Sequence, residues 1–238
     1  MWLRKTVAAI IPLSKESDYL FDVVQDLDAT SYIDEILIVG RFENIKYFKR
    51  IQKTRAKIIK VSRDSIGYAL KRGIRSTKAD LIIITQSDGA FQAKDISKLL
   101  SYSEDFDTVF ASRTHTPLIE KNSGMTFSRR LVDDLFGKMI SILFLSSNLT
   151  DVGCTLRLTN RKGWRRVAKE CDSSSDIFLT QWLIAAAKKK LRFIEIPVNY
   201  TASGSPGNKE SFMFLSGRAI LIFYLIVKAW LLDFLKSS

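Results

Sequence analysis

The sequence is poor in the residues that build disulfide frameworks and zinc sites. Cys154 and Cys171 are its only cysteines, and His115 is its only histidine. Two cysteines can form at most one disulfide, not the framework of a small secreted protein, so we expect a reducing compartment. The scarcity of both residue types also excludes a zinc cluster with the usual ligand spacing.

The chain also lacks a long uncharged apolar run. Its most hydrophobic region covers residues 212–235, but the longest stretch there without a charge is 219–227, which is too short to span a bilayer by itself. We expect an interfacial or partly inserted helix in this region, with a core helix or a helix packed on a second copy as alternatives. Residues 1–5 lead into a strand-like segment without the apolar core and cleavage site of a signal peptide.

The chain has fewer acidic than basic residues. The 37 Lys and Arg against 25 Asp and Glu give a net charge of +12, which suits nucleic acid, an anionic membrane surface or phosphorylated substrates. The basic residues are spread along the chain and do not alternate with aromatic residues in one stretch. We therefore expect no nucleic-acid partner.

Short apolar runs alternate with helix-length segments in the first half of the chain. These runs are rich in β-branched residues and apolar on both faces, as in the buried strands of a parallel sheet. They lie at residues 7–11, 35–39, 57–61, 81–85 and 108–112. Helices are predicted between them at residues 18–27, 43–54 and 67–75. Strands alternating with helices indicate an α/β fold with a Rossmann-like, mostly parallel sheet flanked by helices.

The second half begins with a strongly amphipathic segment at residues 128–146. Its polar residues, which recur at three- and four-residue steps, are Asp133, Asp134, Gly137, Lys138 and Ser141. Such a helix either packs its apolar face on the sheet or lies in a membrane interface. Two more strands are predicted at residues 154–158 and 192–198, and another helix at 177–189.

Several segments resemble motifs of family-two glycosyltransferases of the GT-A fold, and within them the polyprenyl-phosphate glycosyltransferases. Residues 7–16 resemble the opening strand and its Pro-x-x-Asn-Glu turn, here with Pro12 and Glu16. Gly67 stands at the Gly-rich helix entry, and residues 85–89 lie where the metal-binding Asp-x-Asp motif belongs. The resemblance implies donor binding by these residues together with Gln86 and Asp88.

The later motifs point to the acceptor. Residues 107–113 resemble the strand that ends in Gly-Ser-Arg, residues 151–157 the Asp-x-Gly-Cys-x-x-Arg segment, and residues 192–200 the late strand. The resemblance implies transfer of a sugar from a nucleotide-sugar to a polyprenyl phosphate or a related acceptor, with Mg²⁺ or Mn²⁺ held by Asp88. A different acceptor, such as another sugar, is the alternative. A phosphate acceptor is already an anion, so it needs cations to orient it rather than a general base.

Specific roles follow for the residues in these motifs. Arg113 and Arg157 are expected to bind the acceptor phosphate, because a guanidinium fork matches phosphate geometry; structural ion pairing is the alternative. Lys209 is expected in a loop at the same phosphate. Asp151 would orient Arg157 or contact the sugar. The predicted catalytic set is Asp88, Arg113, Asp151 and Arg157, and Asp80 is a further candidate near the nucleotide.

The sequence departs from the family pattern at the acidic positions. Val39-Gly40-Arg41 stands where an Asp usually contacts the nucleotide, and Gln86 replaces the first Asp of Asp-x-Asp. These changes favour a second hypothesis, a catalytically impaired homologue that acts as a binding or scaffold subunit.

The expected organisation is a GT-A domain over residues 1–210 followed by a membrane-associating helix over 211–238. Within the domain, residues 1–113 would bind the nucleotide-sugar and residues 114–210 the acceptor. The lipid phosphate and the positive charge place the protein at the cytoplasmic face of a membrane. The hydrophobic C-terminal helix also makes a homo-oligomer an open alternative.

Overall fold

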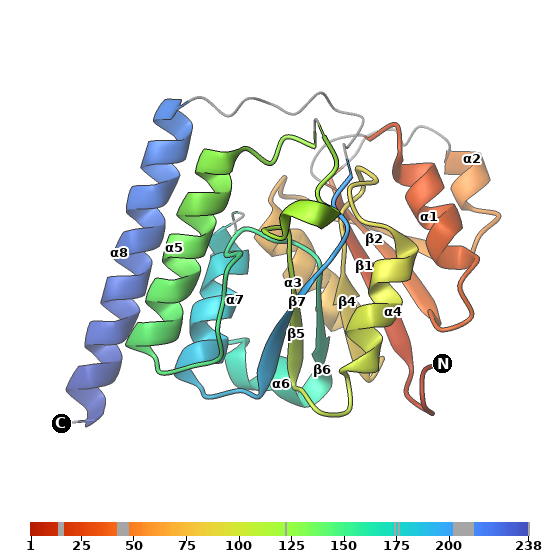
Figure 1. Ribbon diagram of the computed structural model, residues 1–238. Coiled ribbons are helices and arrows are strands. Elements are labelled where there is room, and N and C mark those ends of the chain that lie inside the picture. Colours follow the sequence, from red (N-terminus) through yellow and green to blue (C-terminus); the bar gives the residue numbers. More distant parts are fainter. Residues whose placement is uncertain are drawn as a thin grey trace.

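A computed structural model describes residues 1–13, 17–41, 48–121, 123–173, 175, 177–201 and 212–237. Its centre is a seven-stranded sheet (Figure 1). The strands are β1 (Val7–Leu13), β2 (Glu35–Gly40), β3 (Ala56–Lys60), β4 (Leu81–Ile84), β5 (Thr108–Ser112), β6 (Arg157–Asn160) and β7 (Phe193–Pro197). The order is β3-β2-β1-β4-β6-β5-β7, and only β6 runs antiparallel to its neighbours. The predicted mostly parallel α/β sheet is confirmed.

Both faces of the sheet are buried, which explains the apolar runs. Successive side chains of a strand point to opposite faces, so Ile10 joins one hydrophobic cluster while Ala9 and Ile11 join the other. In β4, Ile82 and Ile83 divide in the same way. Strands with this environment read as continuous hydrophobic segments rather than alternating ones.

Helices cover the two faces in separate groups. One face carries α1 (Leu20–Asp28), α2 (Phe48–Ile51) and α4 (Ala93–Ser101), and the other carries α3 (Ile66–Ser76), α6 (Arg161–Val167) and α7 (Ile177–Lys188). The two remaining helices, α5 (Phe127–Leu143) and α8 (Phe212–Ser237), lie side by side and pack outside the group that contains α7 (Figure 1). Among the described residues, no helix is both long and apolar enough to cross a membrane.

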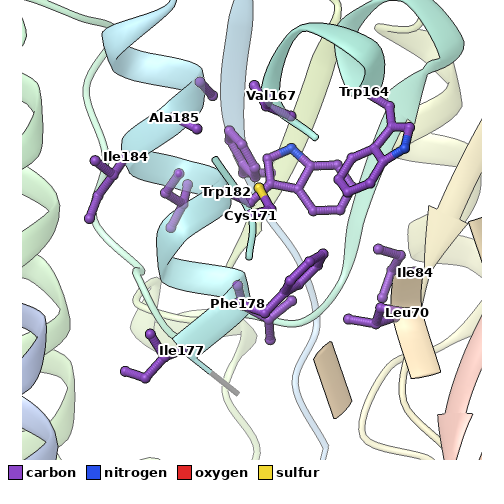
Figure 2. Close-up of a cluster of buried hydrophobic side chains, with 14 of the residues drawn as sticks. Leu70, Ile84, Trp164, Val167, Cys171, Ile177, Phe178, Trp182, Ile184 and Ala185 are labelled. Carbon is purple, nitrogen blue, oxygen red and sulfur yellow. The ribbon is translucent and has the colours of Figure 1, made fainter. Parts of the chain in front are cut away.

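An aromatic cluster joins α6 and α7 on one face of the sheet (Figure 2). The ring centroids of Trp164 and Trp182 are 4.7 Å apart, and Phe178 lies edge-on to Trp182 at 6.0 Å. Aromatic pairs in such tilted arrangements add stability beyond the area they bury. This packing fixes α7, the most apolar helix of the sheet layers, against β4 and α3 through Ile84 and Leu70.

Some boundaries and elements differ from the sequence-based expectation. The strand predicted at residues 154–158 is β6, which begins only at Arg157. Helices α4 and α6 were not predicted, because short polar segments of nine and seven residues give little periodicity. The helix predicted at residues 43–54 ends at Ile51, because residues 52–54 form a turn, and its start falls in residues 42–47, which lie outside the described part. Cys154 and Cys171 are buried and free.

The rotation of α5 differs most from its amphipathic pattern. Asp133 and Gly137, assigned to the polar face, are buried, while Leu131 and Leu135 are exposed. Gly137 allows the close contact, because a Cβ there would lie 2.4 Å from the Leu149 carbonyl oxygen. The small residue and the inward carboxylate therefore decide which face packs, against the hydrophobic pattern.

Replacing Gly137 with alanine tests this packing. The added methyl group has no space against the backbone of Leu149, so Gly137→Ala should lower the free energy of unfolding by about 1–3 kcal/mol. Gly217→Ala in α8 is the matched control, because its Cβ would meet nothing within 4 Å and alanine favours helix. Denaturant unfolding followed by circular dichroism measures both; equal stability of the two variants would contradict the close contact.

Candidate active site

The candidate site lies at the carboxyl edge of the sheet. Parallel strands bring their carboxyl ends to one edge, where open α/β sheets bind ligands. Pro12 is buried near the end of β1, the turn with Gln86 and Asp88 follows β4, and Arg113 follows β5. The sheet thus gathers predicted residues that lie up to about a hundred positions apart in the first half of the sequence.

The turn after β4 contains two side chains whose oxygen atoms could ligate a cation, Gln86 and Asp88. Asp88 is half-buried and accepts a hydrogen bond from the Ala90 backbone N–H at 3.1 Å, and Gly89 takes the positive φ that this turn requires. Burial raises the pKa of Asp88, which its hydrogen bonds and the nearby Arg113 charge oppose. Gln86 has a buried Oε1 atom without a hydrogen-bond partner.

Neighbouring segments hold this turn from both sides. Ser17 donates its hydroxyl hydrogen to the Ser87 carbonyl oxygen at 2.8 Å, and Thr201 donates to that of Gly89 at 3.0 Å. Carboxylate and amide oxygens suit a hard divalent cation, which often takes its other ligands from substrate phosphates and water. Among the described residues, no group of three or more Asp, Glu, His or Cys side chains is arranged so that it could hold a metal ion. In this turn, Asp88 and the unsatisfied Gln86 oxygen are the side-chain ligands whose chemistry fits such a cation.

Arg113 and Asp151 form a buried ion pair beside this turn. The Arg113 backbone N–H and Nε–H both donate to Asp151 Oδ2 at 2.8 Å, and Nη2 donates to Oδ1 at 2.8 Å. Arg113 is only 3% exposed, and its guanidinium lies 5.3 Å from the centre of the Tyr200 ring. Burial favours the neutral carboxyl, but the charge and hydrogen bonds of Arg113 hold the pKa of Asp151 below its ordinary value.

Two further acids surround this pair. Asp133 of α5 lies 3.7 Å from Arg113 Nη2, and its Oδ2 atom is buried without a hydrogen-bond partner. Burial, with the Asp151 charge, raises the pKa of Asp133 to about 6. Glu195 of β7 accepts from the Thr150 backbone N–H at 2.7 Å and from the Asp151 N–H at 3.0 Å. Burial raises the pKa of Glu195 to about 7.

Arg157 does not reach the site, which corrects its expected role. It is 1% exposed, and its guanidinium donates to the carbonyl oxygens of Leu179 and Cys154. The rings of Phe110 and Trp182 each lie 5.3 Å from it. Burial without a close carboxylate lowers the pKa of Arg157 to about 10. In this position Arg157 lies between β6 and α7 and is closed to a phosphate. Asp151 orients Arg113, not Arg157.

Of the remaining predicted residues, Gly67 and Asp80 are described by the structure, and Glu16 and Lys209 are not. Gly67 is buried in the first turn of α3, where Ser65 caps the helix by accepting from the Tyr68 N–H. Asp80 precedes β4 at the opposite edge of the sheet and accepts from the Thr6 N–H at 2.9 Å, so it does not approach the site. Glu16 and Lys209 lie outside the described residues.

Sequence reasoning missed Asp133, Glu195 and Tyr200 as members of the site. Glu195 did give a signal, because it is a single charge between Ile194 and Ile196 in a predicted strand. Asp133 was hidden by the polar stripe of α5, which suggested a solvated face.

An open pocket of about 360 Å³ adjoins the site through Tyr200. The Tyr200 backbone pairs with Leu118 and Glu120, and Thr201 pairs with Ala90 of the Asp88 turn. The pocket is lined by Thr116, Ile119, Glu120, Lys121, Ser123, Gly124, Met125, Thr126 and Arg130. Arg130 donates to the Thr116 hydroxyl at 2.6 Å and keeps its Nε–H buried without a partner.

The sequence matches no protein-family model. One curated relative, the low-salt glycan biosynthesis hexosyltransferase Agl6 of Haloferax volcanii, is 24% identical over 148 residues. This region covers 61% of the present chain and 35% of Agl6, so the chain spans about a third of the length of that relative.

Crystal structures of glucosyl-3-phosphoglycerate synthase from Mycobacterium tuberculosis have a similar fold. The complex with Mn²⁺, UDP and phosphoglyceric acid gives a TM-score of 0.71 at 12% identity, covering 95% of this chain and 79% of the synthase. The complex with Mn²⁺, UDP-glucose and phosphoglyceric acid gives 0.71 at 13% identity, covering 95% and 80%. At such identities the likeness shows the fold, which is a GT-A-type Rossmann-like fold.

The raised pKa values predict how stability depends on pH. An acid with a raised native pKa stabilises the fold below its unfolded pKa, and this contribution is lost as pH rises through the native pKa. Stability should therefore fall as pH rises through about 6 for Asp133 and about 7 for Glu195. Asp151, with its lowered pKa, is ionised throughout this window and does not reverse the trend.

Asp133→Asn should remove the contribution of Asp133 to this decrease in the free energy of unfolding, which is roughly 3 kcal/mol between about pH 4 and pH 8. Asp134→Asn is the matched control, because Asp134 pairs with Lys138 near the surface. Denaturant unfolding across this pH range measures the slope. The same pH slope in Asp133→Asn and wild-type protein would contradict the raised pKa.

Proposed function

We propose that this protein is a glycosyltransferase that moves a sugar from a nucleoside diphosphate-sugar to a phosphate-bearing acceptor. The observation that carries the proposal is the turn after β4, at the carboxyl edge of a GT-A-type sheet. In this turn Asp88 lies close to Arg113, and Gln86 has a buried side-chain oxygen without a hydrogen-bond partner. The hexosyltransferase Agl6 and the synthase complexes with UDP-glucose and Mn²⁺ support the same class of reaction.

The donor would bind through its diphosphate. Gln86 and Asp88 would hold Mg²⁺ or Mn²⁺ together with phosphate oxygens. This cation would neutralise the negative charge that develops on the departing nucleoside diphosphate. Arg113 adds a buried positive charge close to Asp88, although its three hydrogen bonds to Asp151 make it a positioning residue rather than a free phosphate ligand.

The acceptor would place its phosphate in the pocket at the start of α5. Lys121 and Arg130 supply positive charge there, and Thr116, Ser123 and Thr126 supply hydroxyl groups. The N-terminus of α5, where Thr126 caps the Arg129 N–H, lies at this pocket, and the positive end of the helix dipole attracts an anion. Glu120 also lines the pocket, and its charge favours an acceptor phosphate that carries further hydrogen-bond donors or a neutral tail.

The chemistry needs no general base at this acceptor. An ionised phosphate oxygen would form a bond to the anomeric carbon while the bond from that carbon to the diphosphate breaks, and the electron pair leaves with the nucleoside diphosphate. We propose a polyprenyl phosphate as the acceptor, used at the cytoplasmic face of a membrane. The phosphoglyceric acid bound by the similar synthase is also a phosphate-bearing molecule, which supports the acceptor class.

A catalytically impaired homologue is the second candidate function. Gly40 lies where the ends of β1 and β2 approach so closely that a Cβ would be 2.0 Å from the Leu13 carbonyl oxygen. An aspartate contact to the nucleotide is therefore ruled out at this position of the described backbone. Together with Gln86 in place of a carboxylate, this favours weaker donor binding.

Asp88→Asn tests the proposed donor site. Loss of the only carboxylate in the turn should reduce cation-dependent binding of a nucleotide-sugar by at least about tenfold, since a carboxylate is the stronger ligand for a hard cation. Asp105→Asn is the control, because Asp105 is exposed beyond α4. Calorimetric titration with UDP-glucose and other nucleotide-sugars, with and without Mn²⁺, measures this. Binding that needs no Mn²⁺, or is unchanged in Asp88→Asn, would contradict the site.

Arg130→Gln tests the proposed acceptor pocket. Removing the guanidinium should raise the KM for a phosphate acceptor about tenfold or more while donor affinity stays unchanged, because a charge-assisted hydrogen bond contributes about 1.5–3 kcal/mol. Arg165→Gln on α6 is the control, since Arg165 is exposed at the opposite edge of the sheet. Equal acceptor KM values for Arg130→Gln, Arg165→Gln and wild-type protein would assign the acceptor to another surface.

A further inference from the structure

The outer surfaces of α5 and α8 carry most of the exposed large apolar side chains of the described residues. On α5 these include Phe127, Leu131, Leu135 and Ile142, which at about 100° per residue fall within an arc of roughly 80°. Leu135 is 62% exposed and Ile142 70%. This stripe extends from the first turn of the helix to the last and is interrupted by Lys138.

A second apolar stripe runs along α8. Its exposed members within an arc of roughly 120° are Ile220, Phe223, Tyr224, Leu231, Phe234 and Leu235. Soluble proteins rarely expose apolar surface in continuous patches of this kind unless a partner covers it.

The two stripes meet in one groove. A groove of about 540 Å³ is lined by Leu135, Phe136, Lys138, Met139, Ile142 and Leu143 of α5 and by Phe223 of α8. Figure 1 shows α5 and α8 side by side, with both helices starting at the same edge of the molecule. The stripes and the groove therefore form one surface, which we call the α5–α8 face.

We propose that the α5–α8 face binds the surface of an anionic lipid bilayer. The helices would lie in the interface, with their apolar side chains among the acyl chains and their positive charges at the head groups. The net charge of +12 is complementary to anionic lipid. Binding of this face to lipid does not depend on sugar transfer, so the two proposals fail separately.

The lysines favour a bilayer over a second copy of the chain. Lys138 lies within the α5 stripe and pairs with Asp134. Lys228 is exposed next to the α8 stripe, with its ammonium 5.6 Å from the centre of the Tyr224 ring. In a bilayer such side chains bury their methylene groups and extend the ammonium group to lipid phosphates. In a two-fold contact between copies they would be desolvated beside apolar groups.

The position of the face also suits a lipid-borne acceptor. Phe127 begins the α5 stripe, and its neighbours Thr126 and Arg130 line the proposed acceptor pocket. The guanidinium of Arg130 lies 5.9 Å from the centre of the Phe127 ring. A bilayer on the α5–α8 face would therefore bring head-group phosphates to the level of this pocket.

Vesicle co-sedimentation of the full chain tests the proposal. We expect binding to vesicles of phosphatidylcholine with phosphatidylserine, and weaker binding to phosphatidylcholine alone. Phe223→Gln and Leu135→Gln should each weaken binding about tenfold, by loss of a membrane-inserted apolar side chain. Phe48→Gln is the matched control, because Phe48 is similarly exposed (42% against 52% for Phe223) on α2, away from this face. Circular dichroism checks that the variants fold.

The charge component has its own variant. Lys228→Gln should weaken binding to the phosphatidylserine vesicles about fivefold and leave binding to neutral vesicles unchanged. Vesicle binding that Phe223→Gln and Leu135→Gln leave intact, or no vesicle binding at all, would overturn the proposal. A dimer in sedimentation equilibrium that these two variants dissociate, with no vesicle binding by wild-type protein, would assign the face to a second copy of the chain.

Discussion

The buried pair between Arg113 and Asp151 is the interaction on which the candidate site depends. A guanidinium that is 3% exposed has lost its water, and removing the partner of such a buried charge typically costs about 3–5 kcal/mol. Asp151 satisfies three N–H groups of Arg113, and Glu195 in turn accepts hydrogen bonds from the backbone of residues 150 and 151. The end of β5, the segment before β6 and the middle of β7 are thereby held together at one edge of the sheet.

The same pair determines how α5 is rotated. Asp133 is directed inward to Arg113, and Gly137, one turn later, allows the helix to lie against the backbone of Leu149. With these positions on the inner face, Leu131 and Leu135 necessarily point outward. The electrostatics of the site and the exposed apolar face are thus two consequences of one helix orientation. The cluster holds three acids and one buried arginine, and burial resolves the excess negative charge by raising the pKa of Asp133 and Glu195.

The proposed reaction uses the sheet edge for the donor and the start of α5 for the acceptor. Thr201 and Tyr200 connect the Asp88 turn to the Arg130 pocket. The backbone of Thr201 is hydrogen-bonded to Ala90 after this turn, and the backbone of Tyr200 is hydrogen-bonded to Leu118 and Glu120 at the pocket. A membrane on the α5–α8 face would meet this arrangement from the acceptor side. The proposed donor, acceptor and lipid surfaces therefore lie in the order that a transfer to a lipid-borne phosphate needs.

The sequence predicted the α/β fold, and it predicted the position of Asp88 in the turn after β4. Buried parallel strands and a turn that presents Asp88 are local features, because β-branched apolar runs predict the strands and an Asp-Gly pair predicts the turn. The rest depends on residues far apart in the chain. Whether an arginine binds a phosphate or packs inside the core cannot be read from its motif, and Arg157 proved to be enclosed by Phe110, Trp182 and backbone carbonyl groups.

The sequence by itself determined the alternation of strands and helices, the positive charge and the chemistry available at the carboxyl edge of the sheet, because these follow from composition and short-range pattern. Only the tertiary structure decided the partners of Arg113, the raised pKa values of Asp133 and Glu195 and the outward orientation of Leu131 and Leu135. The physical reason is that the free energy of a buried charge depends on the groups around it, and these groups come from distant positions in the sequence. A helix such as α5, which has polar and apolar residues on each face, is oriented by its tertiary contacts rather than by its own hydrophobic pattern.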